Sequence, residues 1–394
     1  FLMLLLITGL IPLQSVAAAR FAPPASVNAA STCAGFIPST ITTPANLITA
    51  INQANGANCP GTDTIDLGGN TITFTSGAFT IGGAAVALPE ITTPMTITNG
   101  TLTRSSGTDY RYLQVANISL TLSNLTVSNG GGSNSTYGGG IYNGGTLTLN
   151  NSTVSGNSGG YGGGIYNNSG TLTLNNTTVS GNSAVVYGGG IYNNSGTLTL
   201  NNSTVSGNLG VYVGGIYNNS GTLTLSNSTV SGNSADIGGG IYNSGSLTLN
   251  NSIVANSASG GDCENFSSVN AFYSLIEDGS CVSGLSSTPD ANGNISGDPM
   301  LDAGFMPQAG SPVIDRGNPV SPLGTPPACL STDFNGTARP LDGAGFDGAR
   351  CDMGAFEAPT ITPSTLTFSG PGFVVEGGGM LFRITRSGGT NAIA

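Results

Sequence analysis

Apolar and polar residues alternate over short stretches in the middle of this chain, and the alternation recurs with a fixed period. In the stretch from Thr146 to Leu149, leucines would lie on one side of a strand and threonines on the other. A glycine run and an Ile-Tyr-Asn sequence precede each stretch, and the isoleucine recurs at positions 141, 165, 191, 216 and 241, with spacings of 24, 26, 25 and 25 residues. Such a period is typical of a solenoid, a propeller or an array.

A repeat of about 25 residues favours a parallel β-helix over the other repeat folds. A propeller blade needs about 40 residues, and a helical repeat needs a 3.6-residue apolar period. We therefore predict an all-β fold: a single-stranded parallel β-helix, which we expect to be right-handed from the general crossover preference.

Stacked coils place equivalent residues about 4.8 Å apart, so each position of the repeat forms a column. We predict that leucine, valine and isoleucine columns fill the interior, while Thr146 and Thr148 face outward. Asn150, Asn151 and Asn157 suit coil corners and can bond to the next coil, although a ligand site is the alternative. The predicted interior columns are Leu147, Leu172, Leu198, Leu223 and Leu247; Leu149, Leu174, Leu200, Leu225 and Leu249; and Val154, Val179, Val205, Val230 and Val254.

Segments outside the repeats are expected to close the core and to stabilise the chain covalently. Residues 44–54 predict a short helix, with Thr43 as N-cap and Pro44 in the first turn, that covers the N-terminal end. The six cysteines also lie outside the repeats. Pairing of sequence neighbours, one of several possible connectivities, gives Cys33–Cys59, Cys263–Cys281 and Cys329–Cys351.

Composition excludes several chemistries. The 394 residues carry a net charge of −11, only 7% are charged, and histidine and lysine are absent. A Ser-His-Asp triad, a histidine-ligated zinc, a lysine Schiff base and a P-loop are therefore excluded, and nucleic-acid binding is not expected. Between Tyr112 and Ala235 there is no charged residue. We expect no enzyme, because these coils lack the ionisable groups of acid, base or metal catalysis.

Two sets of residues are candidates for binding. The outward tyrosines that follow the isoleucines predict a stripe for a glycan or a protein partner, with structural packing under a loop as the alternative. The second set matches positions 1, 3, 5 and 9 of a calcium-binding loop. Ile295 and Leu301, however, occupy positions 6 and 12, where Gly and Glu are expected. The alternative is that the residues of the second set form Asx turns. The two sets are Tyr142, Tyr166, Tyr192, Tyr217 and Tyr242, and Asp290, Asn292, Asn294 and Asp298. Apart from calcium, no cofactor is expected.

The N-terminal residues predict export. Residues 1–19 resemble a signal peptide, with an apolar run and an Ala-Ala-Ala site but no basic start, so we expect residues to be missing before Phe1. The run is shorter than the roughly 20 residues that span a bilayer. We expect a secreted or cell-surface, monomeric protein with no transmembrane span in this chain.

Four segments resemble known families of exported bacterial proteins. The G-G-G-I and V-S-G-N tetrapeptides of residues 61–261 are similar to polymorphic outer-membrane-protein repeats. Residues 262–358, with Asp333-Phe334-Asn335-Gly336, resemble the choice-of-anchor Q domain. The cap at 20–60 is similar to a CSLREA-type segment at Leu47, Ala50 and Ile51. After a linker at 359–364, residues 365–394 resemble the incomplete start of an immunoglobulin-like Calx-beta module.

The resemblances imply a non-enzymatic cell-surface protein whose β-helical stalk serves adhesion or display. One alternative is a carbohydrate-active β-helix, a lyase or hydrolase, and another is a calcium-stabilised structural surface protein. For the enzyme alternative, acids and cations are available in the first coils and in the C-terminal cap; those of the first coils are Asp63, Asp66, Glu90, Arg104, Asp109 and Arg111.

Overall fold

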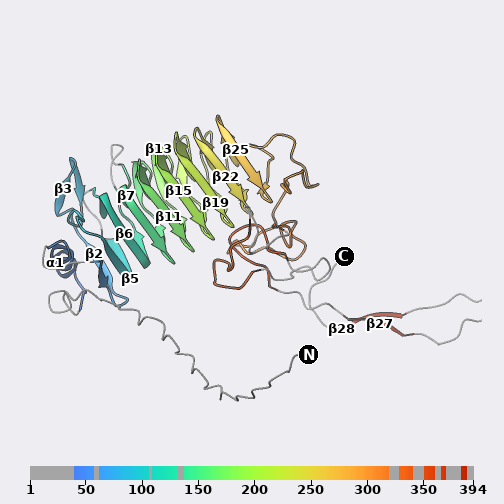
Figure 1. Cartoon of the computed structure of the whole chain (residues 1–394), viewed down its shortest axis with the longest axis horizontal. Helices are drawn as coiled ribbons and strands as arrows, with labels where there is room; N and C mark the ends of the chain where they lie inside the picture. The colour runs from blue at the N-terminus through green and yellow to red at the C-terminus, as the bar shows by residue number, and fades with distance from the viewer. Residues whose placement is uncertain are drawn as a thin grey trace, which may run out of the picture.

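The chain folds as a parallel β-solenoid with one helix at its N-terminal end (Figure 1). The computed structural model describes residues 40–56, 62–105, 109–131, 137–318, 328–339 and 350–359 and the strands at 365–369 and 383–387. Within these residues, 21 strands join in parallel ladders. The predicted fold class is therefore confirmed. The Cys33–Cys59 pair and the segment before residue 40 lie outside the described residues.

Helix α1 (Pro44–Ala54) forms where the sequence predicts it. The Thr43 side chain accepts a hydrogen bond from the Asn46 amide at 3.2 Å, which caps the helix N-terminus. Leu47, Ile51 and Ala54 are fully buried and belong to the same apolar core as the first strands. The helix thus covers the open end of the solenoid, which would otherwise expose its core.

The first coils use longer strands than the repeats do. Strand β5 continues through two faces of a coil and β6 through three, and β1 and β2 both pair with β5. A small antiparallel hairpin, β3–β4, projects beside them. The bounds are β1 (Asp63–Asp66), β2 (Thr71–Phe74), β3 (Phe79–Ile81), β4 (Ala84–Val86), β5 (Met95–Arg104) and β6 (Leu113–Ser128).

Each repeat then forms three faces and a short fourth strand. The Ile-Tyr-Asn face contains β7 (Ile141–Asn150, which continues into the next face), β10 (Ile165–Asn168), β14 (Ile191–Asn194), β18 (Ile216–Asn219), β21 (Ile241–Asn243) and β24 (Cys263–Asn265). The Thr-Leu-Thr-Leu face contains β11 (Thr171–Asn175), β15 (Thr197–Asn201), β19 (Thr222–Ser226), β22 (Ser246–Asn250) and β25 (Ser268–Phe272). The Thr-Val-Ser face contains β8 (Thr153–Ser155), β12 (Thr178–Ser180), β16 (Thr204–Ser206), β20 (Thr229–Ser231), β23 (Ile253–Ala255) and β26 (Leu275–Ile276). A separate sheet holds β9 (Ser158–Tyr161), β13 (Ser183–Tyr187) and β17 (Leu209–Gly210).

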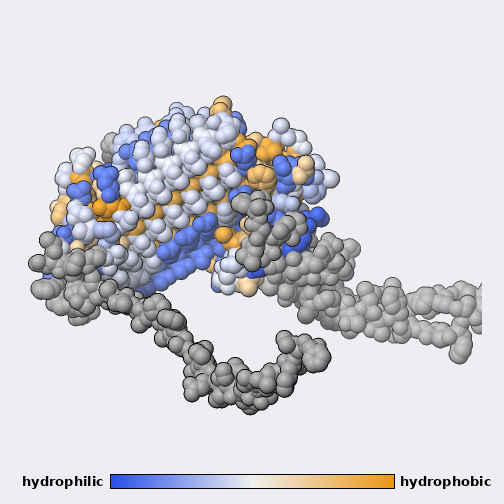
Figure 2. Space-filling model, in the orientation of Figure 1, coloured by the Kyte–Doolittle hydropathy of each residue, from blue (hydrophilic) through white to orange (hydrophobic). Residues whose placement is uncertain are grey.

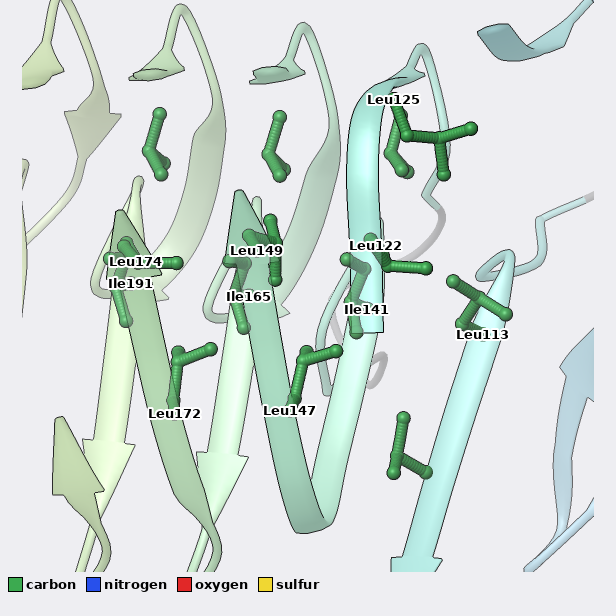
Figure 3. Packing of buried hydrophobic residues seen from close by; sticks show 14 of the residues in the cluster. Leu113, Leu122, Leu125, Ile141, Leu147, Leu149, Ile165, Leu172, Leu174 and Ile191 are labelled. Carbon is green, nitrogen blue, oxygen red and sulfur yellow. The ribbon is translucent and has the colours of Figure 1, made fainter. Parts of the chain in front are cut away.

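Equivalent residues of successive coils pair one to one. Leu172, for example, pairs with Leu147 in the coil before it and with Leu198 in the coil after it. All the predicted leucine and valine columns have no exposed surface, and neither has the isoleucine column (Figure 3). Figure 2 shows the outer columns as bands of uniform hydropathy that run from coil to coil.

Buried asparagines form two hydrogen-bonded ladders along the interior. In the first, the Nδ2 atom of each residue donates to the Oδ1 atom of the next at 2.7 to 2.8 Å. In the second, the same contact measures 2.9 to 3.0 Å. The predicted bonding between stacked asparagines is therefore confirmed. The ladders are Asn143, Asn167, Asn193, Asn218, Asn243 and Asn265, and Asn157, Asn182, Asn208 and Asn233.

A third asparagine column turns the chain at one corner of the coil. Asn151, Asn176, Asn202, Asn227 and Asn251 have φ values of 46 to 48°, in the left-handed region that asparagine tolerates better than most residues. This confirms the corner prediction for Asn151. Asn157 also lies at a corner, between β8 and β9 and next to Gly156 with φ of 64°, and its buried side chain belongs to the second ladder.

Coil stacking continues past residue 261, the boundary that composition indicates, through β24, β25 and β26. Cys263 occupies the isoleucine column, pairing with Ile241, and forms a disulfide with Cys281. The smaller Ala271 follows the leucine column. Val282 and Leu285 pack against the core from the adjoining loop. The disulfide therefore ties a covering loop to the last coil.

The described parts of the C-terminal segment, residues 328–339 and 350–358, pack along the side of the last repeats rather than extending the stack (Figure 1). The Leu330 amide donates to Asn227 Oδ1 at 2.9 Å, and Asn202 Nδ2 donates to the Thr332 carbonyl oxygen at 2.7 Å. The Gly354 amide donates to the Asn251 carbonyl oxygen at 2.7 Å. The corner asparagines thus bind the segment, which the disulfide Cys329–Cys351 also closes on itself. Both described disulfides match the predicted pairs.

Beyond residue 359, two antiparallel strands are described, β27 (Thr365–Ser369) and β28 (Arg383–Ser387). Both strands belong to the segment, residues 365–394, whose sequence resembles the start of an immunoglobulin-like module. The rest of that segment lies outside the described residues.

Replacing Gly189 by alanine should separate two coils. A Cβ atom there would lie 2.3 Å from the Leu209 carbonyl oxygen, so the backbone must shift. We expect a loss of about 1–3 kcal/mol of stability, measured by thermal unfolding with circular dichroism. Gly144→Ala is the control, because its Cβ would lie no closer than 3.4 Å to a neighbouring atom. Equal unfolding temperatures for both variants would contradict this packing.

Replacing Asn193 by serine should open the first buried ladder. Serine is too short to accept from Asn167 and to donate to Asn218, so their buried amide groups lose partners. Each unsatisfied group costs about 1–3 kcal/mol, and the unfolding temperature should fall. Asn201→Ser provides the comparison, since that column lies on the outer side and already contains Ser226. A similar loss in both variants would argue against the buried ladder as the cause.

Candidate functional site

The predicted tyrosine column lies on the outer side of the Ile-Tyr-Asn face. Tyr166 pairs in register with Tyr142 and Tyr192, and the isoleucine before each tyrosine points into the core. Ring centroids of successive tyrosines from Tyr142 to Tyr242 are 4.8 to 5.5 Å apart. The structure therefore brings all five residues together as one row, called here the inner row.

A second row of tyrosines, not singled out in the sequence, lies against the first. Three of its rings contact an inner-row ring of the following coil: Tyr137 meets Tyr166 at 5.0 Å, Tyr161 meets Tyr192 at 5.9 Å, and Tyr187 meets Tyr217 at 5.1 Å. A signal for this row was present, because a tyrosine stands just before the glycine run in most repeats. The outer row consists of Tyr137, Tyr161, Tyr187 and Tyr212, and the two rows with Phe266 are called the aromatic face.

Exposure varies within the aromatic face. Tyr166 and Tyr192 are only 7% and 8% exposed, whereas Tyr137 and Tyr212 are 44% and 41% exposed. Phe266, which stacks on Tyr242 at 5.1 Å, is 66% exposed. The remaining tyrosines of both rows are half-buried, so Tyr137, Tyr212 and Phe266 form the most accessible part of the aromatic face.

Exposed aliphatic side chains extend this surface. Val185 lies in β13 with Tyr187, and Leu209 lies in the adjacent β17. Across the described residues, seven of the eight large exposed apolar or aromatic side chains belong to the aromatic face or to the strands and loops beside its outer row; these seven are Tyr137, Val185, Leu209, Val211, Tyr212, Ile237 and Phe266. An apolar concentration of this kind marks an interaction surface.

Amide groups orient the phenol groups of the inner row. Asn168 Nδ2 donates to the Tyr142 hydroxyl at 2.7 Å, and Asn219 Nδ2 donates to the Tyr192 hydroxyl at 3.2 Å. Asn194 links these two asparagines in a ladder of its own. Burial, with the neighbouring phenols, raises the pKa of Tyr166 to about 12. The rings are therefore uncharged at neutral pH and fixed in orientation.

Charged groups occur only toward the ends of the aromatic face. The Arg111 guanidinium carbon lies 5.0 Å from the Tyr142 ring centre, a cation–π contact, and burial lowers the pKa of Arg111 to about 10. At the other end Glu264 stands in register with Tyr242. Between these ends the repeats contain no charged residue up to Asp236.

The candidate calcium residues form an Asx loop. Asp290 Oδ1 accepts hydrogen bonds from the amides of Asn292 and Asn294 at 2.8 and 2.9 Å. Asn294 is buried, and its Oδ1 accepts from the Ser274 amide. Asp298 Oδ1 accepts from the Met300 amide. The side chains of Asp290, Asn294 and Asp298 thus make hydrogen bonds within the local fold, whereas Asn292 contributes its backbone amide. No cluster of metal-type ligands occurs within the described ranges.

The same loop recurs twice further along the chain, which the sequence reasoning missed. Asp302 Oδ1 accepts from the amides of Gly304 and Met306, and Asp333 Oδ1 accepts from those of Asn335 and Thr337. In all three loops the residue three positions after the aspartate has a positive φ, 78° at Gly293, 66° at Phe305 and 83° at Gly336. The acidic residues of this region therefore stabilise tight turns.

Asp333 is also one of four buried carboxylates in the C-terminal segment and the chain before it; the other three are Asp315, Asp352 and Glu357. Arg339 Nη1 lies 3.1 Å from Glu357 Oε2, with both side chains fully buried. Asp352 accepts from the Asp315 and Ala358 amides at 2.7 and 2.6 Å. Because these groups have little contact with solvent, they hold the segment together and do not form an accessible acid pair.

The charged residues of the first coils also make structural contacts. Arg104 Nη1 donates to the Gly131 carbonyl oxygen at 2.9 Å, and Asp66 accepts from the Gly68 amide and from Asn99. Arg111 is only 4% exposed. None of these contacts assembles the acids and cations of the enzyme alternative around one groove within the described residues.

Comparison with protein-family models, with curated proteins and with solved structures finds no match for this chain. The part of the chain that the structure describes contains no helix long and apolar enough to cross a membrane.

The buried carboxylates predict a loss of stability at alkaline pH. Burial and the nearby Glu357 carboxylate raise the pKa of Asp352 to about 8, against about 3.9 in an unfolded chain. Between these values the folded chain keeps a proton that the unfolded chain has released, so the free energy of unfolding should fall as pH rises through about 8.

Thermal unfolding between about pH 5 and pH 9 measures this dependence. Asp352→Asn should flatten it, because the variant cannot ionise, although it is less stable at low pH through the loss of one accepted hydrogen bond. Stability that rises over the interval, or an equal slope in the variant, would contradict the assignment.

Proposed function

We propose that this protein is an exported, non-enzymatic surface protein whose β-solenoid is a rigid stalk that presents the aromatic face for adhesion. The observation that carries the proposal is the gathering of nearly all the large exposed apolar side chains on one lateral surface. Soluble proteins rarely expose such a patch without a partner.

The rest of the architecture supports a stalk. One continuous core runs from helix α1 to the last coil, so the coils stack along a single axis. Two disulfides close the C-terminal region, and disulfides persist in oxidising, extracellular compartments. The signal-like N-terminus and the resemblance to polymorphic outer-membrane-protein and choice-of-anchor Q sequences agree with display at a cell surface.

Binding, rather than catalysis, suits the chemistry of the aromatic face. Its inner-row phenols at Tyr166 and Tyr192 have raised pKa values, so they are poor general bases near neutral pH. The rings are held by mutual contacts and by amide groups, which reduces the entropy lost when a partner binds. A preformed, uncharged surface of this kind can hold a ligand without changing it.

The proposal is tested by adhesion of beads coated with the chain to cell surfaces and to extracellular polymers. Tyr137, Tyr212 and Phe266 are replaced together by serine, which removes exposed rings with little effect on the core. We expect adhesion to be lost. The control replaces Thr171, Thr197 and Thr222 by serine, because these exposed residues lie on another face, in a column where Ser246 already stands.

Adhesion that survives the ring substitutions would exclude the aromatic face as the adhesive surface. Chemical cleavage of the bound polymer would overturn the non-enzymatic assignment. Circular dichroism of each variant shows whether the fold is retained.

A further inference from the structure

We infer that the ligand of the aromatic face is an uncharged, linear polysaccharide that lies lengthwise along the solenoid axis, with about one sugar for each coil. The inference rests on the proposed function and specifies its ligand class. Three properties of the aromatic face carry it: the absence of charge from its central coils, the mixed chemistry of its side chains and the recurrence of an aromatic ring in each coil from Tyr142 to Phe266.

The lack of positive charge on the central coils excludes acidic polymers as ligands. A ligand with sulfate, phosphate or carboxylate groups along its length needs cations beside it. Arg111 is the arginine at the aromatic face, and it is buried under the ring of Tyr142 at one end. From Tyr112 to Ala235 the chain offers no compensating charge. The occupant of the central coils must therefore be uncharged.

The chemistry of the surface matches that of a sugar. Each tyrosine presents an apolar ring together with a hydroxyl that can donate and accept hydrogen bonds. Asn168, Asn194 and Asn219 place amide groups beside the inner hydroxyls. A pyranose ring likewise combines an apolar C–H face with a rim of hydroxyls, so it can contact both kinds of group at once.

The repeat distinguishes a polymer from a folded protein. Inner-row ring centres recur at 4.8 to 5.5 Å, and outer-row centres recur at 5.0 to 6.1 Å. A sugar unit in an extended, equatorially linked chain advances by a similar distance, so successive units meet equivalent side chains. A globular partner has no such translation and would match only part of the surface.

The length of the aromatic face sets the length of the ligand. Six ring positions, one in each coil from Tyr142 to Phe266, mark the length of the aromatic face. At about 4.8 Å for each step the face extends over roughly 25 Å. Affinity should therefore rise with oligosaccharide length and level off at about six sugars.

The test uses calorimetric titration of the whole chain with neutral β-1,4-linked oligosaccharides of glucose, mannose, xylose and N-acetylglucosamine, from dimers to octamers. Polygalacturonate, alginate and heparin are the charged comparison. At least one neutral series should bind with the expected length dependence. Its affinity should be insensitive to added salt, because no exposed ion pair forms.

A shortened face gives the sharper test. Replacing Tyr212 and Phe266 by serine removes rings at the C-terminal end of the face only. Affinity for long chains should fall by about tenfold for each ring lost, and the plateau should move to shorter oligosaccharides. The triple threonine-to-serine variant described above should bind like the unchanged chain.

The outcomes separate this inference from the proposed function. If the aromatic face mediates adhesion but binds only charged glycans or a protein, or binds neutral glycans without length dependence, the inference is wrong and the adhesive function stands. If the ring substitutions change neither adhesion nor glycan binding, both are wrong.

Discussion

The structure depends on one constraint: each side chain of a coil must pack against the equivalent side chain of the next coil. Most residues of the repeat strands meet an identical residue about 4.8 Å away in the next coil, as Leu172 meets Leu147 and Leu198. An asparagine satisfies this condition well, because its amide donates on one side and accepts on the other, as Asn167 does between Asn143 and Asn193. A charged residue would meet its own charge and be repelled. The same rule explains why leucine, threonine and asparagine dominate the repeats and why charges are absent from them.

At the two ends of the stack a coil has a neighbour on one side only, and the sequence there departs from the repeat. Helix α1 covers the first coil with side chains that belong to the same core. In the last coils Cys263 replaces isoleucine and Ser257 replaces the asparagine of the second ladder. The Ser257 hydroxyl has no hydrogen-bond partner among the described residues, which shows the ladder stopping. Charged residues return in the C-terminal segment, where each position occurs once and can be paired individually, as Arg339 is with Glu357.

The repeating part of the fold could be predicted because its contacts are fixed by local pattern. Alternation in Thr146 to Leu149 fixes which side chains are buried, and the period fixes which copies stack. The position of the C-terminal segment could not be predicted in this way. The bond between Leu330 and Asn227 joins residues far apart in sequence, and no periodicity links them. The aspartate loops were missed for another reason: their spacing resembles a cation-binding loop, and only the geometry shows that backbone amides occupy the Asp290 oxygen.

The two tyrosine rows differ in what they contribute to stability. Tyr166 and Tyr192 are nearly buried, and aromatic contacts of this kind contribute about 0.5–1.5 kcal/mol each beyond the burial of area. The inner row therefore has a structural explanation of its own. Tyr137 and Tyr212 keep more than two fifths of their surface exposed and gain correspondingly less from burial. If these two positions contributed only to the stability of the fold, smaller polar residues would suffice there. Because the exposed aliphatic residues lie beside the outer row and not on the threonine face, this distribution supports the proposal that the row serves binding more than stability.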